Sequence, residues 1–282
     1  MSDIAITRDE LAVWSRYVQE ICGVYLDESK GYLLETRLEG LLRETGTHGF
    51  SELYYKAKSD PSEGLRRKII NAITTNETSF FRDTSPFELL QHKVIPDLID
   101  RRGKTGLRPL PIRIWSAACS TGQEVYSTGI VIKELLGDLR NYDVRILGTD
   151  ISDKAVAQAS YGHFNRQELD RGISSDKVSK YFVPEGDRWK IRDEIRALAN
   201  FRRMNLMEPF SFPGPFDIVF CRNVAIYFTE QDKIRLFKNI AKCLARDGYL
   251  IIGATESISG LCPEFEPKRY LRAVFYQFKV SA

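Results

Sequence analysis

Residues 113–124, RIWSAACSTGQE, constrain the fold more than any other stretch of this 282-residue chain. An apolar run from Arg113 to Ala117 leads into small residues that end at Gly122, and a helical pattern follows over 123–136. A strand, a tight turn and a helix N-terminus in this order form the unit with which doubly wound α/β folds hold a nucleotide-like ligand. The stretch therefore predicts an α/β domain with a ligand site at this turn.

A second strand supports an adenosine site. The apolar run 144–149 ends in Asp150, and Ser152 begins the next helical pattern. An acid at the tip of the second strand accepts hydrogen bonds from both ribose hydroxyls of an adenosine. The spacing fits two cofactors, a dinucleotide and S-adenosylmethionine.

The turn favours S-adenosylmethionine. A dinucleotide site needs G-x-G-x-x-G so that the backbone approaches the pyrophosphate, whereas this turn has one glycine. It also places Glu124 just inside the helix, where a carboxylate repels a pyrophosphate and suits an ammonium or sulfonium group. An ordinary strand–helix turn, in an enzyme whose site lies elsewhere, remains the alternative.

The rest of the chain from residue 111 alternates strand and helix patterns. This alternation predicts a mostly parallel, doubly wound sheet between layers of helices. The expected strands are 112–117, 144–149, 200–204, 216–221, 248–253 and 273–280, and the expected helices are 123–136, 152–160 and 230–245.

Four regions differ in their patterns. Residues 1–75 carry apolar residues at helical spacing between short polar breaks, which predicts an all-helical domain. Residues 76–110 form a linker expected to contribute to the site, and 111–282 form the cofactor-binding domain. Within it, 161–199 interrupts the alternation with YFVPEGDRWKI, which predicts a hairpin in a small β-subdomain inserted in the sheet domain.

Composition narrows the functional class. A net charge of +3 is too mild to indicate a nucleic-acid partner. Five cysteines without C-x-x-C spacing and three scattered histidines predict reduced thiols and no metal site. No apolar run reaches the length of a transmembrane helix, and the polar start MSDIAITRDELAVW does not resemble a signal peptide. We expect a cytoplasmic protein without membrane insertion.

Two further strands end in polar residues, where doubly wound folds bind ligands. FRRMNL ends with Asn205 and Leu206, an amide that could read an adenine edge beside an apolar face. FDIVFCRNVAIYF ends with Arg222 and Asn223, and Tyr227 follows. Side chains that merely cap the strand ends are the alternative.

The linker carries an unusual mixture of residues. TTNETSFFRDTSPFELL places polar Asn76, Thr78 and Arg82 around two phenylalanines, Phe80 and Phe81. We expect the aromatic rings to anchor the segment while the polar groups face a cleft shared by the two domains.

These segments together resemble the chemotaxis receptor methyltransferase (CheR) family. TTNETSFFRD, WSAACSTGQEVYS, LGTDIS, the Asn-Leu pair and PGPFDIVFCRNVAIYF occur in the family's order over about residues 10–280. The resemblance implies the doubly wound sheet of class I S-adenosylmethionine methyltransferases. It implies esterification of glutamates on the cytoplasmic signalling helices of chemoreceptors, with S-adenosylmethionine as methyl donor and S-adenosylhomocysteine as product. It also implies cofactor contacts at Asn76, Thr78, Arg82, Glu124, Asp150, Asn205, Leu206, Arg222 and Asn223.

The chemistry is consistent with the residues present. A glutamate carboxylate is ionised at neutral pH and is itself the nucleophile, so no general base is required. Catalysis then depends on alignment of the reacting groups, with Arg82 expected to position the carboxylate and Tyr227 to line the methyl-transfer channel. A basic helix face with Arg37 and Arg43 is expected to dock the acidic receptor, although a solvated face explains the same charges.

Other interpretations follow from the same residues. A regulatory adaptor that binds S-adenosylmethionine without turnover would not need Arg82 or Tyr227. An RNA methyltransferase would need a basic groove or an N-P-P-Y-like motif, where this chain has NVAI. Family members that tether to a receptor C-terminal pentapeptide have a longer, glycine-richer hairpin loop than PEGDRW, so we expect an enzyme that acts without this tether. We also expect a monomer.

Overall fold

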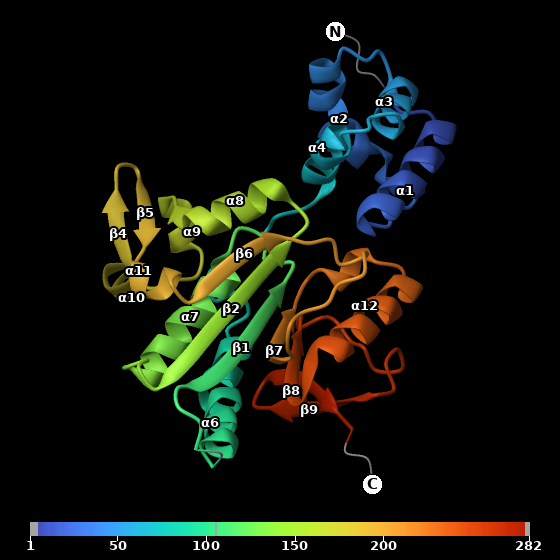
Figure 1. The fold of residues 1–282 in the computed structure, drawn as a ribbon. Coiled ribbons are helices and arrows are strands. Elements are labelled where there is room, and N and C mark those ends of the chain that lie inside the picture. The colour runs from blue at the N-terminus through green and yellow to red at the C-terminus, as the bar shows by residue number, and fades with distance from the viewer. Residues whose placement is uncertain (1–4, 105, 280–282) are drawn as a thin grey trace.

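A computed structural model describes residues 5–104 and 106–279 (Figure 1). Its centre is a seven-stranded sheet of order β6-β2-β1-β7-β8-β10-β9. The first five strands are parallel, and β10 runs antiparallel to both of its neighbours, β8 and β9. The strands are β1 (Leu110–Ala117), β2 (Tyr142–Asp150), β6 (Ala199–Arg203), β7 (Phe216–Cys221), β8 (Leu244–Ile252), β9 (Phe265–Tyr270) and β10 (Ala273–Phe278). The doubly wound α/β sheet is confirmed.

The two faces of the sheet bury alternate residues of its strands. On one face, Ile112 and Ile114 of β1 pack with residues of α7 (Gln123–Leu136) and of the helical stretch 85–103. On the other face, Trp115 and Ala117 pack with α12 (Glu230–Cys243). This alternation follows from the pleat, which turns successive side chains to opposite faces, and it creates two cores around one sheet.

The first part of the chain forms four helices around a separate core that includes Trp14 and Leu34. They are α1 (Arg8–Cys22), α2 (Gly31–Thr45), α3 (Phe50–Lys58) and α4 (Gly64–Ile73), with a short 3₁₀ turn η1 (Glu28–Lys30). The helices lie beyond the carboxyl ends of the parallel strands (Figure 1). Their position closes the edge of the sheet where doubly wound folds bind ligands.

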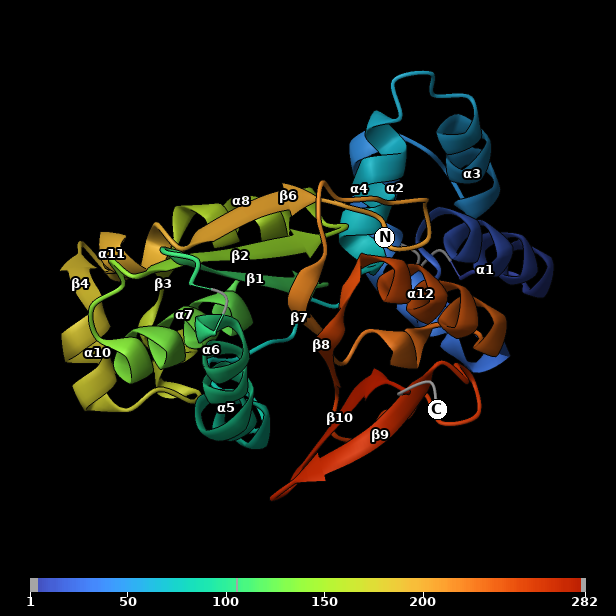
Figure 2. The ribbon, with the colours of Figure 1, turned by 60° about the horizontal axis from the view of Figure 1, so that its bottom comes forward.

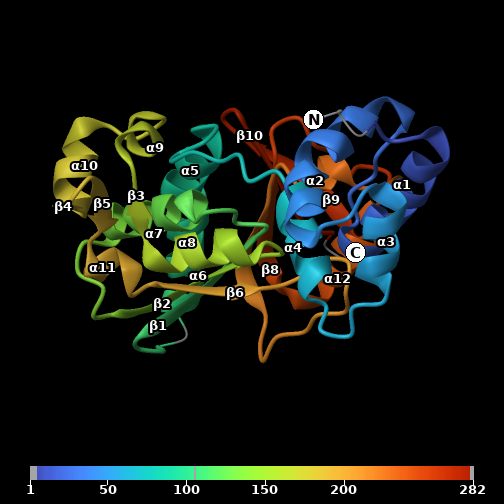
Figure 3. The same ribbon diagram turned by 90° about the horizontal axis from the view of Figure 1, so that it is seen from above.

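The predicted hairpin is present. β4 (Phe182–Glu185) and β5 (Arg188–Ile191) pair antiparallel, and β3 (His163–Phe164) joins them in a three-stranded sheet of order β3-β5-β4. α8 (Asp153–Tyr161) packs on β2 and β6 of the large sheet. Short helices complete the small subdomain, namely α9 (Arg166–Asp170), α10 (Ser175–Tyr181) and α11 (Asp193–Arg196). The hairpin and the N-terminal helices lie at opposite ends of the molecule (Figure 3).

The structure differs from the sequence prediction in three places. Residues 85–103 are a continuous helical stretch, α5 (Ser85–Leu89), a π-helical turn η2 (Leu90–Val94) and α6 (Ile95–Gly103). β9 was not predicted and forms the outer edge of the sheet beside β10 (Figure 2). β8 begins directly after α12, at Leu244, whereas the predicted strand began at residue 248. Val280, the last residue of the predicted strand 273–280, lies outside the described residues. Among the described residues, no helix has the length and apolarity needed to cross a membrane.

Candidate active site

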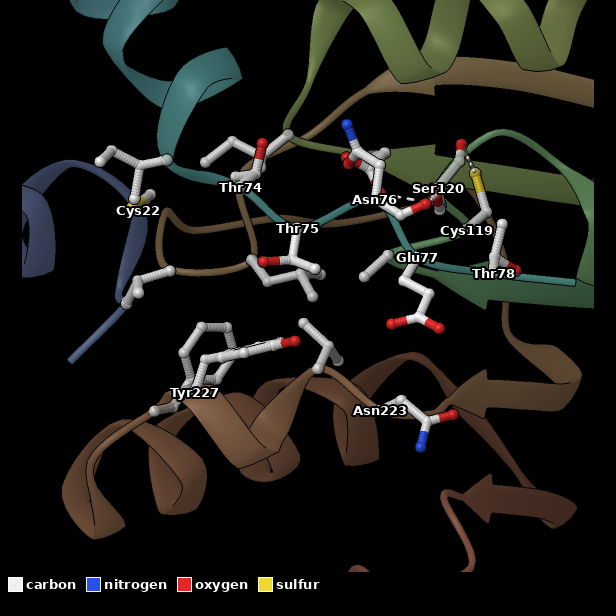
Figure 4. A pocket seen from close by; sticks show the side chains of 18 of the residues that line it. Cys22, Thr74, Thr75, Asn76, Glu77, Thr78, Cys119, Ser120, Asn223 and Tyr227 are labelled. Atoms are coloured by element: carbon white, nitrogen blue, oxygen red, sulfur yellow. Dashed lines mark hydrogen bonds between the residues drawn. The ribbon is translucent and has the colours of Figure 1, made fainter. Parts of the chain in front are cut away.

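One cavity collects every site residue predicted from the sequence. It lies between the carboxyl ends of the strands, the N-terminal helices and the segment that connects the two (Figure 4). The predicted residues that line it are Asn76, Thr78, Arg82, Glu124, Asp150, Asn205, Leu206, Arg222, Asn223 and Tyr227. Segments that are distant in the sequence thus meet at one site, although each residue's role is a separate question.

The turn after β1 has a backbone that few residues adopt. Ala118, Ser120 and Gly122 have positive φ angles of 59°, 51° and 93°, and side chains disfavour this left-handed region. At Gly122 a Cβ atom would lie 2.9 Å from the Cβ of Ala159 in α8. Only glycine permits this close approach, so the single glycine of the motif fixes both the turn and its packing against α8.

Asp150 is buried at the end of β2 and joins the two strand tips. Its Oδ2 accepts a hydrogen bond of 2.8 Å from the Ser120 N–H, and its Oδ1 accepts one of 2.9 Å from the Ser152 N–H. Burial raises the pKa of the Asp150 carboxyl, against the opposing effect of these backbone donors. Each carboxylate oxygen has further acceptor capacity, which the ribose hydroxyls of an adenosine would use.

Glu124 is paired with a buried arginine. Its Oε2 lies 2.8 Å from Nη1 of Arg222, and its Oε1 accepts a 2.7 Å hydrogen bond from the Ser116 hydroxyl. Nη2 of Arg222 also contacts the Asp83 carboxylate at 2.9 Å and the Arg82 carbonyl at 2.8 Å. One cation against two carboxylates leaves a net negative charge beside the cavity, so the predicted preference for a cationic ligand survives the pairing.

The segment 74–83 is tied down along its length and forms one wall of the cavity. Arg37 donates to the carbonyls of Ile73 and Thr74 and to the Thr75 hydroxyl, so it caps the C-terminus of α4. The Ser120 hydroxyl donates to the Asn76 carbonyl at 2.8 Å. These bonds couple the wall to both the helical domain and the turn after β1.

The two phenylalanines of this segment anchor it as expected. Phe80 is buried against Phe164 and Phe182 of the small subdomain, with ring centroids 4.9 Å and 5.4 Å away. Phe81 packs edge-on against Phe87. The polar side chains on either side of them, Asn76, Thr78 and Arg82, line the cavity.

Three polar side chains at the cavity retain unused hydrogen-bonding groups. The Arg82 guanidinium makes one hydrogen bond within the described chain, 3.0 Å from Nη1 to the Glu77 carbonyl. Lys30 forms no ion pair with any carboxylate in the described ranges. The Tyr227 side chain faces Glu77 and Thr75 across the cavity (Figure 4). Neither cation is paired with a carboxylate in the described chain, so both are available to an anionic substrate group. The Glu77 carboxylate at the same cavity pairs with Arg171 at 3.2 Å.

Asn205 and Leu206 line the cavity and also have partners inside the protein. The Asn205 amide donates to the Ile21 carbonyl at 3.0 Å and to Glu208 at 3.1 Å, and its oxygen accepts from the Met207 N–H. This side chain joins α1 to the sheet, and Leu206 beside it packs in the core around α12. Their contact with the cofactor stays a prediction.

The predicted basic helix face has partners inside the helical domain. Arg37 caps α4, and Arg43 pairs with Glu39 one turn away on the same helix. The solvated-face alternative implied such pairing, and docking of a receptor on this face stays a prediction. Arg37 also lines the cavity, together with Lys30 and Arg82.

A cleft shared by the two domains was predicted, but the residues that the helical domain contributes to it were not. Val24, Tyr25 and Lys30, in the loop between α1 and α2, line it together with Thr75 and Glu77 of the wall. The one local signal was Gly23, which ends α1 with φ 77° and places a prospective Cβ 2.6 Å from Met207. A glycine in such tight contact marks a place where two chain segments meet.

Comparisons with known proteins agree with this geometry. Residues 76–271 match the family model described as "CheR methyltransferase, SAM binding domain", and residues 9–74 match "CheR methyltransferase, all-alpha domain". A "Chemotaxis protein methyltransferase Cher2" of Pseudomonas putida is 39% identical over 268 residues, 93% of this chain and 95% of that protein. A "Chemotaxis protein methyltransferase" of Vibrio parahaemolyticus is 36% identical over 282 residues, 99% of this chain and 100% of that protein.

Solved structures of lower similarity include the magnesium protoporphyrin IX methyltransferase ChlM of Synechocystis PCC 6803 with bound SAM. It is 15% identical, covers 79% of this chain and 93% of its own, and has a TM-score of 0.34. The family models and the two relatives carry the conclusion, because they span nearly the whole chain at substantial identity. The chain belongs to the CheR family of S-adenosylmethionine-dependent chemotaxis protein methyltransferases.

Proposed function

We propose that this methyltransferase esterifies glutamate side chains on the cytoplasmic signalling helices of chemoreceptors. The observation that carries the proposal is the pair of unpaired cations, Arg82 and Lys30, in the same cavity as Asp150. A carboxylate acceptor would be attracted to them and would complete their hydrogen bonding. An amine acceptor would gain nothing from two cations. Acting on such a substrate, the protein would work in the cytoplasm, and we propose that it does so as a monomer.

The cavity fits S-adenosylmethionine at its other end. Asp150 would hold the ribose hydroxyls, and the net negative charge of Glu124, Arg222 and Asp83 would favour the positively charged methionine part. Asn76, Thr78 and Asn223 would complete this end with polar groups. The cofactor supplies an activated methyl group on a sulfonium centre.

The protein's own residues would then orient the acceptor. Arg82 would hold the glutamate carboxylate through the free nitrogens of its planar fork, with Tyr227 beside it from the opposite wall. No side chain needs to remove a proton, because the acceptor is already ionised at neutral pH. Alignment of preformed reactants is a term that reaches roughly 7–11 kcal/mol, and exclusion of water by the walls strengthens the attraction between the charges.

We also propose that the enzyme does not require a receptor pentapeptide tether. Such a peptide would add as a strand to an edge of the small sheet. The longer edge strand is β4, and the other, β3, has two residues. Glu185 and Arg188 flank a two-residue turn and form its hydrogen-bonded pair, so the backbones of Pro184 and Phe182 face outward. Pro184 has no N–H, and the Phe182 N–H already donates to the Val178 carbonyl. This edge therefore has no free donor for an added strand.

The ester itself is the decisive test of the proposed function. The protein is incubated with methyl-labelled S-adenosylmethionine and receptor-rich membranes, and the labelled receptor is treated with mild base. A glutamyl methyl ester should release its label as methanol, whereas N-methyl and thioether products survive. Label that resists base, or receptor that takes up none, would contradict the proposal.

The tether is tested separately with a synthetic pentapeptide and with receptors that lack one. Titration calorimetry should detect no useful affinity for the peptide, and receptors without the pentapeptide should be methylated at similar rates. A low-micromolar Kd for the peptide would contradict tether independence without affecting the ester assignment.

A further inference from the structure

Two short turns that contribute Tyr25 and Tyr227 to the cavity wall expose large apolar side chains. Tyr25 follows α1 and is 57% exposed, whereas Ile226 and Tyr227 belong to the 3₁₀ turn η3 (Ala225–Tyr227), where Ile226 is 51% exposed. The Tyr25 N–H donates to the Tyr227 carbonyl at 2.8 Å, so the turns are joined although they lie about 200 residues apart in the sequence. We call Tyr25, Ile226 and Tyr227 the rim.

The rim is held rigidly by buried neighbours. Gly23 lies against Met207 and Phe228, where a Cβ would be 2.6 Å and 3.0 Å from their side chains. Leu26 on one side, and Ala225 and Phe228 on the other, are buried. Apolar side chains fixed between anchored residues, yet left in water, are typical of a surface that a partner covers.

The position of the rim restricts what could cover it. The cavity is lined by two residues of the rim, Tyr25 and Tyr227, and also by Lys30. A side chain that enters the cavity therefore brings the surface from which it projects against these residues. On a helix, that surface consists of the residues three and four positions before and after the entering one.

We propose that the rim binds the acceptor helix through apolar residues one turn away from the glutamate to be methylated. This inference rests on the proposed function and adds a requirement to it: the sequence around an acceptor glutamate must be apolar on the same helix face. Lys30 complements the acidic character of such a helix. The rim thereby selects among glutamates that are chemically equivalent.

The test compares rim variants with matched variants elsewhere on the surface. Tyr25→Ala and Ile226→Ala are compared with Tyr161→Ala, whose ring is 70% exposed at the end of α8, and Leu271→Ala, 64% exposed between β9 and β10. Initial rates of base-labile methylation are measured against receptor concentration. We expect KM to rise about tenfold for each rim variant, with kcat within about twofold, and no change for the matched variants. Tyr25→Phe, which keeps the ring, should retain the wild-type KM.

Three outcomes would overturn the inference. The first is a KM in the rim variants equal to that of the matched variants. The second is a comparable loss of S-adenosylmethionine affinity by calorimetry, which would place the cofactor on the rim. The third is a dimer, seen by sedimentation, that Tyr25→Ala dissociates, which would place a second copy there. If wild-type protein forms no base-labile ester, the proposed function fails instead, so the two failures are distinguishable.

Discussion

The two halves of the cavity, named for the ligands that we propose for them, use their polar groups differently. On the cofactor half, Asp150, Glu124 and Arg222 are buried or nearly so and have partners within the protein, although Nε of Arg222 has none in the described chain. On the acceptor half, Lys30 and Arg82 keep most of their donors free of partners in the described chain. The charged groups of the first half are therefore largely paired internally, whereas the two cations of the second are not.

This difference follows from what each half binds. A bound cofactor stays in place through the reaction, so a network fixed in advance costs no reorganisation when the methyl group moves. Both ligands leave after each turnover, the cofactor as S-adenosylhomocysteine, but the acceptor enters as a side chain of another protein. Free cations attract its carboxylate without first breaking internal ion pairs. Substitutions should therefore act on stability and cofactor affinity in one half and on turnover in the other.

The largest effect is expected at Arg222. Arg222→Met leaves the Glu124 carboxylate beside Asp83 without its cation, and a charge stranded in this way costs about 3–5 kcal/mol of folding stability. Urea denaturation measures the change. The double variant Arg222→Met/Glu124→Gln removes the stranded charge and should recover part of the loss. Equal stability of wild type and Arg222→Met would show that these charges are not paired as described.

Arg82 tests the other half of the comparison. Arg82→Ala removes the fork that would hold the acceptor, and a misplaced reactant costs roughly 100-fold in kcat. Folding stability should hardly change, because this guanidinium makes a single internal hydrogen bond. Arg82→Lys keeps the charge without the planar fork, so its kcat in steady-state kinetics should lie between those of wild type and Arg82→Ala. A stability loss as large as that of Arg222→Met would erase the distinction between the halves.

The sequence predicted the cofactor half better than the acceptor half, for a physical reason. Strand ends of a parallel sheet must meet at one edge, so Asp150 and Glu124 could be brought together from their order in the chain. Nothing in a local pattern states how a separate helical domain packs on that edge. Tyr25 and Lys30 were therefore missed, although the helices on either side of them were predicted.

Hydrogen-bond partners were also beyond the sequence. Asn205 has the residue type and position of a cofactor contact, yet its amide joins α1 to the sheet. Arg37 was interpreted as part of a basic face, and its guanidinium also caps α4. In both cases the competing partner is a backbone carbonyl, which every sequence contains and no residue pattern reveals.

Asp150 gives the smallest of the three effects and the most specific one. Asp150→Ala should weaken S-adenosylmethionine binding by about 1.5–3 kcal/mol, the range for losing hydrogen bonds to a charged group. The sign of its pH dependence follows from the raised pKa in the free protein. A carboxylate that accepts ribose hydroxyls must be ionised, so affinity should be complete above that pKa and decline as the pH falls through it, earlier than for an ordinary aspartate. Calorimetry at successively lower pH, as far as the fold remains intact, should show this decline in wild type, and Asp150→Ala should lack it. A wild-type affinity in Asp150→Ala, or the same decline in both proteins, would remove Asp150 from the cofactor half.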